Sequence, residues 1–390
     1  MTTGTTRDDL DRLRAAILGD AAWQAALAAH DDAEAFAAEA LALAAARGIG
    51  LTRERLMPAL RDDPLGLARW SDAALSAEPP PQGWLPVEVL PMDGELCVEW
   101  AYFGRRALRA SFFEGDARRA LRRPLGRLLR YRTRLADLAR WQDRLGGLQP
   151  SGFLFHMSRC GSTLATQMLS ADPRNVVVCE ARPLDAIVQM GQGAPSRLLA
   201  AMVAALGRRR DGAQSRYVLK LDSWHALALP LFRRAFPSVP WVFLYREPAE
   251  VLASQMHRRG IQTMPEHFPP ALYGLEPGLP AEIHCARVLA RTCEAVLEPF
   301  AAGGGLLVNY RDMPQALWTQ ILPHFGMEAS AEDRARMAAA ARNDAKAPDK
   351  AFVGDDGERR RLTETLRATA EREIGGIYAR LEALRRGAPR

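Results

Sequence analysis

The chain has 390 residues, 48% of them hydrophobic, and a formal net charge of +6 at neutral pH. This length supports a full hydrophobic core and predicts two to three domains, and the modest positive charge suits an anionic ligand. No apolar run approaches the ~20 residues that a membrane helix needs, which argues against a membrane protein. The first residues do not have the pattern of a signal peptide, so we expect a cytoplasmic protein.

Residues 1–65 have the periodicity of a small helical domain. Apolar side chains recur at helical spacing through 10–27 and again through 36–43, as on one face of an amphipathic helix. Two glycines follow, and Thr52 can cap a further short helix.

The order of residues in this region resembles the Nif11-like domain, the leader region of many ribosomally made peptide natural products. A plain helical appendage is the alternative interpretation. The positions that carry the resemblance are Asp20, Trp23, Gln24, Asp31, Asp32, Phe36, Gly48, Ile49, Gly50, Leu51, Thr52 and Leu56.

Residues 66–84 are predicted to form a proline-rich linker. Residues 85–148 are predicted to form a β-hairpin followed by an arginine-rich helical module. The hairpin is predicted from two apolar runs around Asp93-Gly94, a strong turn signal. The stretch 105–134 holds eleven arginines, a density that can attract nucleic acid or an anionic acceptor. Apolar residues at helical spacing favour an amphipathic helix instead, and no nucleic-acid motif accompanies it.

Residues 153–163 have the pattern of a strand, a tight loop and a helix start. An apolar run breaks at Gly161, and Ser162 and Thr163 open an apolar-periodic helix. Backbone N–H groups converge at such a loop and the helix dipole favours negative charge, so we predict a site for a phosphate-like group. Its cation is Arg159, and the loop lacks the spacing of a nucleoside triphosphatase P-loop.

A second strand run, 241–245, ends at Arg246. Pro248 suits the first turn of the helix that follows, and Ser254 lies further along this helix. Ligands of open parallel sheets bind beyond the carboxyl ends of the strands. We therefore predict that Arg246 and Ser254 hold a second phosphate.

Together the two segments resemble the 5′-phosphosulfate loop and the 3′-phosphate site of sulfotransferases that use 3′-phosphoadenosine-5′-phosphosulfate (PAPS). A third patch, 306–313, resembles the family's strand that ends in Tyr-x-Asp. The resemblance covers roughly residues 150–385 and implies PAPS as co-substrate. The implied site comprises the 5′ loop (Ser158, Arg159, Cys160, Gly161, Ser162 and Thr163), the 3′-phosphate pair (Arg246 and Ser254), and Tyr310 near the adenine.

The chain also departs from this family. Cytosolic members have a lysine in the first loop and Lys-x-His on the next strand, where this chain has Arg159 and Lys220-Leu221-Asp222. The family's C-terminal Arg-Lys-Gly nucleotide loop is missing, and Lys346 or Lys350 is a loose substitute for it.

Transfer to an acceptor hydroxyl requires a proton acceptor, and general-base help is typically worth ~10² to 10⁴ in rate. Glu180 is the first candidate, because it follows the run 176–179 and resembles the catalytic glutamate of protein-tyrosine and some bacterial carbohydrate sulfotransferases. Asp222 and His225 are its rivals, and a base from the substrate or water is the third possibility. Lys220 is expected to be the second cation on the transferred group, since placed positive charge stabilises such a transition state.

Two other residues near the loop receive structural interpretations. His156 is expected to be a satisfied core histidine. Cys160 has a position where the pKa of a thiol can fall, but packing is the favoured role. The five cysteines include no Cys-x-x-Cys pair, which favours a reducing compartment and predicts no metal site.

The third part of the chain, 149–385, is predicted to be a sulfotransferase-like domain of the α/β class. Its expected strands alternate with helices, which predicts a parallel sheet covered on both faces. These strands lie near 152–156, 176–179, 217–221, 241–245 and 305–309.

The predicted function is transfer of the sulfuryl group of PAPS to a hydroxyl or amine of a small molecule, sugar or peptide. One alternative is a Mg²⁺-dependent phosphotransferase that uses Asp222 to hold the metal, although Arg246 has no obvious role there. Another alternative is a non-catalytic protein that binds a nucleotide or a peptide.

Overall fold

The computed structural model of the chain describes residues 4–62, 75–344, 347–351 and 362–387. The chain forms two compact units that interleave along the sequence. The first consists of Met1–Leu148, Arg182–Ile187 and Ala200–Gln214, and the second of Gln149–Ala181, Val188–Leu199 and Ser215–Arg390.

The first unit begins with short helices, as predicted. Their buried side chains include Leu13, Ile17, Leu27 and Phe36, which the helical spacing had picked out. Thr52 stands at a helix N-cap, but its side chain makes no capping hydrogen bond. The helices are α1 (Gly4–Leu18), α2 (Ala21–Leu27), α3 (Ala33–Ala46), α4 (Arg53–Leu56) and the 3₁₀ turn Met57–Leu60.

The predicted hairpin is present as β2 (Trp84–Met92) and β3 (Glu95–Tyr102). Asp93 and Gly94 have φ angles of 50° and 81°, the left-handed values that a tight two-residue hairpin turn requires. The hairpin belongs to a four-stranded sheet of order β1-β4-β3-β2, with β1 at Leu75–Ser76 and β4 at Tyr131–Arg134.

The prediction of one helical stretch over 105–134 is wrong at both ends. Helices α5 (Phe113–Arg122) and α6 (Pro124–Leu128) occupy only its middle. The backbone then becomes extended at Leu129, and Tyr131–Arg134 pairs with β3 as strand β4. Pairing with a neighbouring strand therefore overrides the helical spacing there.

Most arginines of this stretch pair with carboxylates of the same unit. Such pairing reduces the positive charge that nucleic acid would meet, and it supports the amphipathic interpretation. The pairs include Arg105–Asp211, Arg106–Asp31, Arg118–Glu114, Arg119–Asp116, Arg123–Asp31, Arg127–Asp62 and Arg134–Glu95.

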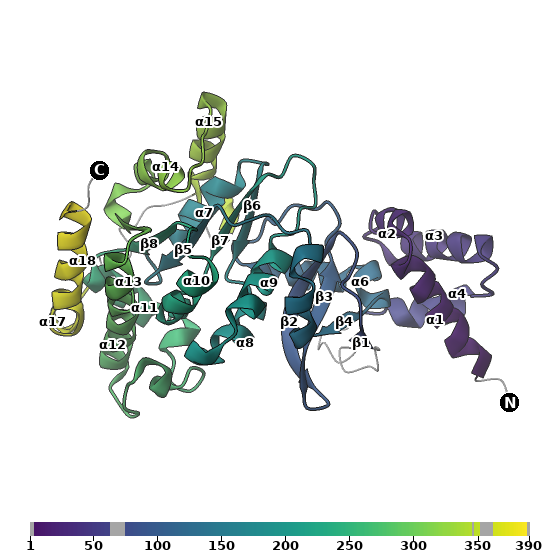
Figure 1. Cartoon of the computed structure of the whole chain (residues 1–390), viewed down its shortest axis with the longest axis horizontal. Coiled ribbons are helices and arrows are strands. Elements are labelled where there is room, and N and C mark those ends of the chain that lie inside the picture. Colours follow the sequence, from purple (N-terminus) through teal and green to yellow (C-terminus); the bar gives the residue numbers. More distant parts are fainter. Residues whose placement is uncertain (1–3, 63–74, 345–346, 352–361, 388–390) are drawn as a thin grey trace. The chain divides into compact units, whose positions relative to one another are not determined.

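The second unit is built on a five-stranded, all-parallel sheet of order β6-β7-β5-β8-β9 with helices around it (Figure 1). The α/β prediction is confirmed, and the predicted strands agree with the observed ones to within one residue. Nearly all residues of these strands are buried, as expected when helices cover a parallel sheet, and the exceptions are Arg216 in β7 and Gly305 and Leu306 in β9. The strands are β5 (Gly152–His156), β6 (Asn175–Cys179), β7 (Arg216–Lys220), β8 (Trp241–Tyr245) and β9 (Gly305–Asn309).

Eleven further helices follow β5 in the described part of the chain, and parts of α8 and α9 belong to the first unit. A short antiparallel pair, β10 (Asn343–Asp344) and β11 (Ala347–Ala351), lies before the last of them. No described helix has the length and apolarity needed to cross a membrane. The helices are α7 (Ser162–Ser170), α8 (Pro183–Val188), α9 (Ser196–Leu206), α10 (Leu229–Ala235), α11 (Pro248–His257), α12 (Ala281–Glu294), α13 (Leu297–Ala301), α14 (Leu322–His324), α15 (Ala331–Ala340), α17 (Glu364–Ala370) and α18 (Gly376–Gly387).

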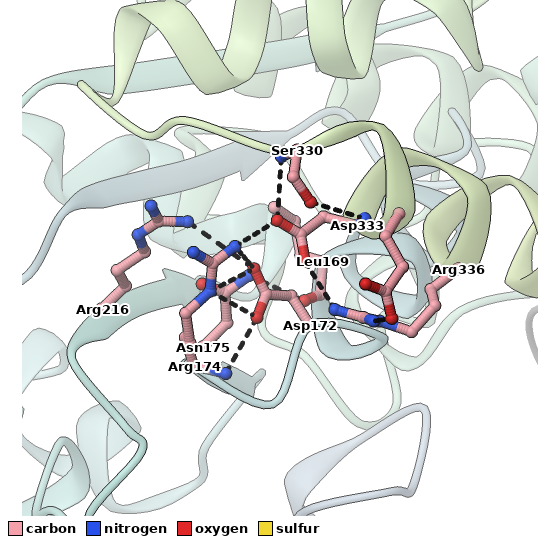
Figure 2. Close-up of polar contacts among 9 residues, drawn as sticks. Leu169, Asp172, Arg174, Asn175, Arg216, Ser330, Asp333 and Arg336 are labelled. Atoms are coloured by element: carbon pink, nitrogen blue, oxygen red, sulfur yellow. Dashed lines mark hydrogen bonds and ion pairs between the residues drawn. The ribbon is translucent and has the colours of Figure 1, made fainter.

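A buried ion cluster joins the turn after α7 to the start of α15 (Figure 2). Asp172, whose side chain is fully buried, accepts hydrogen bonds from Arg174. Arg174 also pairs with Asp333 at 2.5 Å. Asp333 in turn forms a capping box with Ser330 at the first turn of α15. The cluster ties α15 to the loop between α7 and β6.

Candidate active site

The predicted anion loop connects β5 to α7 at the carboxyl edge of the sheet. Ser158, Arg159 and Gly161 all have left-handed φ angles, of 76°, 51° and 79°. Glu180, at the end of the neighbouring β6, has a φ of 52°. Non-glycine residues in this region cost about 1–3 kcal/mol each and cluster at functional sites. Among the described residues only Asp93 of the hairpin turn shares this property with Ser158, Arg159 and Glu180.

Residues of α11 and of the segment that follows it hold the anion loop in this shape. The hydroxyl of Ser158 accepts hydrogen bonds from the amides of Gln255 and Gln262, each at 3.0 Å. The guanidinium of Arg159 donates to the carbonyl of Arg258. Gln255 and Gln262 are buried, and the sequence analysis did not identify them. Nothing in their spacing marks them as neighbours of Ser158.

Cys160 has a structural role. Its thiol is buried and donates to the carbonyl of Leu244 at 3.2 Å. Burial raises the pKa of Cys160 to about 11, so the lowered pKa considered above is not observed, and the favoured packing role fits the geometry.

Glu180, Lys220, His156 and Thr163 form a polar cluster beside the anion loop. Lys220, at the end of β7, is 1% exposed and places Nζ 2.6 Å from Oε1 of Glu180. The same ammonium donates to the hydroxyl of Thr163 at 3.3 Å. His156 Nε2 lies 3.3 Å from the carboxylate. The cluster thus joins the first candidate base to the predicted second cation and to the helix that follows the loop.

The charges in this cluster stabilise each other. Burial alone would raise the pKa of Glu180, but the charge of Lys220 and the hydrogen bond from His156 lower it to about 2. Burial likewise opposes the charged form of Lys220, yet Glu180 raises the pKa of Lys220 above its usual value. Without a ligand, Glu180 is a carboxylate and Lys220 an ammonium at neutral pH.

His156 is neutral in this environment, because burial lowers its pKa. Its Nδ1 accepts a hydrogen bond from the backbone N–H of Ser158 at 3.0 Å, so the ring proton lies on Nε2. That nitrogen faces the carbonyl of Leu221 and the carboxylate of Glu180. His156 is a satisfied core histidine, as expected, and it also connects the anion loop to Glu180.

The predicted 3′-phosphate residues meet the loop through Tyr310. The guanidinium of Arg246 lies over the ring of Tyr310, 4.5 Å from its centroid. A Cβ atom on Gly161 would lie 2.4 Å from that ring, so only glycine permits this approach. Glu250, one turn along α11, pairs with Arg246 at 2.7 Å. The sequence analysis did not identify Glu250.

The remaining predicted residues have less direct positions. Ser254 is buried on α11, on the helix that begins two residues after Arg246. Asp222 caps the 3₁₀ turn η6 (Ser223–Ala228), and its carbonyl accepts from the backbone of His225. His225 is fully buried against the ring of Trp224. Lys346 lies outside the described residues.

The strand ends therefore bring together residues that are far apart in the sequence: the loop after β5, Glu180 after β6, Lys220 at β7, Arg246 after β8 and Tyr310 after β9. Within the described residues no three His, Cys, Asp or Glu side chains gather as metal ligands.

No family model matches the chain, and no curated protein does. Solved structures that match include sulfotransferase STF1 from Mycobacterium tuberculosis H37Rv, 18% identical over 65% of this chain and 83% of that one, with a TM-score of 0.39. The sulfotransferase domain from the curacin biosynthetic pathway is 14% identical over 60% and 98%, with a TM-score of 0.35. Retinol dehydratase in a complex with retinol and PAP is 15% identical over 62% and 85%, with a TM-score of 0.32.

Proposed function

We propose that the chain is a sulfotransferase that uses PAPS and an acceptor with a hydroxyl or amine. The observation that carries the proposal is the polar cluster of Glu180, Lys220, His156 and Thr163 at the edge of a strained anion loop. It supplies a carboxylate, a buried cation and a helix N-terminus side by side, which is what transfer of an anionic group to a neutral acceptor requires.

The residues present fit the two anionic ends of PAPS. Arg159, Lys220 and the backbone N–H groups at the start of α7 would hold the phosphosulfate end. Arg246 and Ser254 would hold the 3′-phosphate, and Tyr310 would contact the base. PAPS supplies the sulfuryl group, whose bond to the 5′-phosphate breaks as the acceptor oxygen or nitrogen bonds to sulfur, so that adenosine 3′,5′-bisphosphate (PAP) leaves.

Glu180 takes the proton of the acceptor in this proposal. Its pKa of about 2 belongs to the ligand-free pair with Lys220. When Lys220 turns to the negative oxygens of the bound co-substrate, Glu180 loses part of that stabilisation and its pKa rises. Lys220 then stabilises the charge that develops on the leaving phosphate, and His156 keeps the carboxylate oriented through Nε2–H.

The test is thermal stabilisation by PAP, compared with 5′-AMP and with Mg·ATP. A ligand at ~100 times its Kd adds roughly 2.7 kcal/mol to native stability, which shifts the Tm by several degrees. We expect a shift with PAP that exceeds that with 5′-AMP. A shift with Mg·ATP alone would favour the phosphotransferase with Asp222, and no shift with any of them the non-catalytic alternative.

Arg246→Ala makes the test specific to the 3′-phosphate. The variant should weaken PAP by about tenfold to a hundredfold, because a charge-assisted contact to phosphate is worth roughly 1.5–3 kcal/mol, and should change 5′-AMP little. Equal losses for the two nucleotides would remove Arg246 from this role.

A further inference from the structure

Two basic side chains beyond α11, of Arg259 and His284, have buried nitrogen atoms without hydrogen-bond partners in the described chain. Nε and Nη2 of Arg259 and Nε2 of His284 are inaccessible to solvent and bond to nothing among the residues that the structure describes. His284, on α12, is only 2% exposed. An unpaired buried polar group costs roughly 1–3 kcal/mol, and a charged one more. Keeping two such groups near each other therefore costs free energy of folding, and a ligand that accepts their hydrogen bonds would recover it.

The two groups also influence each other. Burial and the charge of Arg259 both lower the pKa of His284. Glu266 acts in the opposite direction on His284, but it is exposed and forms no hydrogen bond with either residue within the described chain. Arg259 is therefore a positive charge close to a neutral His284, and no carboxylate among the described residues hydrogen-bonds to the buried nitrogens of either.

The free donors suit an anion that offers two oxygens, such as a carboxylate. Nε and Nη2 lie along one edge of the guanidinium plane, and this edge can donate two parallel hydrogen bonds to the two oxygens of a carboxylate. Nε2–H of a neutral His284 can add a third donor. Such a two-oxygen fork distinguishes a carboxylate from a hydroxyl or an amide.

The pair lies on elements that already touch the proposed site. The residue before Arg259 offers its carbonyl to Arg159, and Gln262, three residues after it, binds Ser158. Helix α12, which carries His284, packs on η6 directly after Lys220 and Asp222, and on the 3₁₀ turn η7 (Ile261–Thr263). The basic pair is thus connected to both the anion loop and the end of β7.

We propose that the acceptor carries a carboxylate, in addition to the group that is sulfated, and that Arg259 and His284 bind it. This inference rests on the proposed function, since it names the acceptor class of the same site. The carboxylate accepts the hydrogen bonds that the buried nitrogens of Arg259 and His284 lack within the described chain, and the neighbouring residues Arg258 and Gln262 connect this position to the anion loop.

The test uses ¹⁹F NMR of trifluoroacetate as a carboxylate probe, with PAP at saturation so that the nucleotide site is occupied. We expect line broadening that acetate reverses, and that Arg259→Gln weakens about tenfold or more, as loss of a charge-assisted fork requires. His284→Gln should weaken it less. Arg258→Gln, which removes the same charge from the exposed neighbouring side chain, should leave it unchanged.

Three results would overturn the inference: no broadening, equal broadening in the wild type and Arg259→Gln, or competition by inorganic phosphate that is stronger than competition by acetate. The PAP-induced Tm shift, measured on every variant, verifies folding. A PAP shift without a carboxylate site leaves the proposed function standing and removes this inference. An Arg259-dependent carboxylate site without a PAP shift removes the proposed function, and with it the assignment of that carboxylate to an acceptor.

Discussion

Glu180 combines a strained backbone with a compensated charge. Its left-handed φ angle directs the carboxylate towards Lys220 and His156, and its N–H donates to the carbonyl of Lys220 at 2.8 Å. Strained conformations of non-glycine residues cluster at functional sites. The strain and the ion pair together favour Glu180 over Asp222, which caps a turn with ordinary geometry.

The ion pair predicts a specific pH dependence. Because the folded pKa of Glu180, about 2, lies below the usual 4.5, its carboxylate contributes stability that is complete above the unfolded pKa and fades as the pH falls from about 4.5 towards 2. Glu180→Gln lacks this contribution. We expect the Tm of the variant to lie below that of the wild type near neutrality and the difference to shrink on acidification.

The measurement is thermal unfolding of both proteins from about pH 7 to pH 3.5. Glu294→Gln serves as the control, since it removes a half-exposed carboxylate from a surface pair with Arg291, and such pairs contribute little. A Tm difference for Glu180→Gln that stayed constant over this range would contradict the assigned charge state. In the transfer reaction, the variant should retain PAP binding and lose ~10² to 10⁴ in kcat.

Substitution of Glu250 should strengthen PAP binding, whereas Arg246→Ala should weaken it. Its carboxylate pairs with Arg246 through both Nε and Nη2, so a 3′-phosphate has to compete with it. Glu250→Gln should therefore tighten PAP by a few-fold and leave 5′-AMP unchanged, because only PAP has the 3′-phosphate. Calorimetric titration of the two nucleotides decides this. Weaker PAP binding in the variant would mean that Glu250 orients Arg246 rather than competing for it.

At the scale of elements, the five strands of the parallel sheet could be predicted because each is a largely apolar run that ends at or just before a polar residue. The starts of the helices after β5 and β8 could also be predicted, from Ser162 and Pro248. Strand β4 could not be predicted, since its residues continue an arginine-rich helical pattern and become a strand only by pairing with β3. The parallel strands and the helix starts follow from the local sequence pattern, whereas β4 depends on long-range pairing.

The site shows the same division. The loop, Glu180, Lys220 and Arg246 could be identified because each follows a strand that the sequence reveals. Gln255, Gln262 and Glu250 could not, since their importance comes from contacts made across the fold. The resemblance to the Nif11-like domain and the roles of the site residues remain predictions.

The ion cluster around Asp172 yields a prediction about stability. Asp172→Asn removes a fully buried carboxylate that pairs with Arg174 and leaves Arg174 with Asp333 alone. Breaking a buried pair costs 3–5 kcal/mol, and Arg174 is partly exposed, so we expect a loss of about 2 kcal/mol in the free energy of unfolding. Urea denaturation measures it, and the m-value should not change.

Glu332→Gln is the matched control for Asp172→Asn. It removes a carboxylate that pairs with Arg336 on the exposed surface of the same helix, α15. Its cost should stay within about 0.5 kcal/mol. Similar losses for the two variants would show that the cluster in Figure 2 contributes no more than a surface pair.

At the scale of the whole molecule, the two compact units interleave along the sequence. Their stability therefore does not follow the order of the predicted domains. The segment Ala200–Gln214 belongs to the first unit although it lies within the sequence of the second. Arg208 in this segment is buried and donates to the carbonyls of Pro80 and Trp84, at 3.0 and 3.2 Å. Burial lowers the pKa of Arg208 to about 10 because it destabilises the charged form, and the hydrogen bonds to the two carbonyls offset part of the cost of burying this guanidinium.

This dependence predicts that a chain beginning at Gln149 will not be a stable protein. It would lose both carbonyl partners of Arg208 and the first-unit surroundings of Met202, Val203 and Leu206, which are completely buried in the full chain. Exposed apolar surface of this kind promotes aggregation.

A chain beginning at Leu75 keeps Pro80, Trp84 and the hairpin and is the matched comparison. We expect the shorter chain to be aggregated and without a PAP-induced Tm shift, and the longer one to remain soluble with the shift. A soluble, monomeric chain from Gln149 that bound PAP like the full protein would show that residues 1–148 are not needed for stability or for PAP binding.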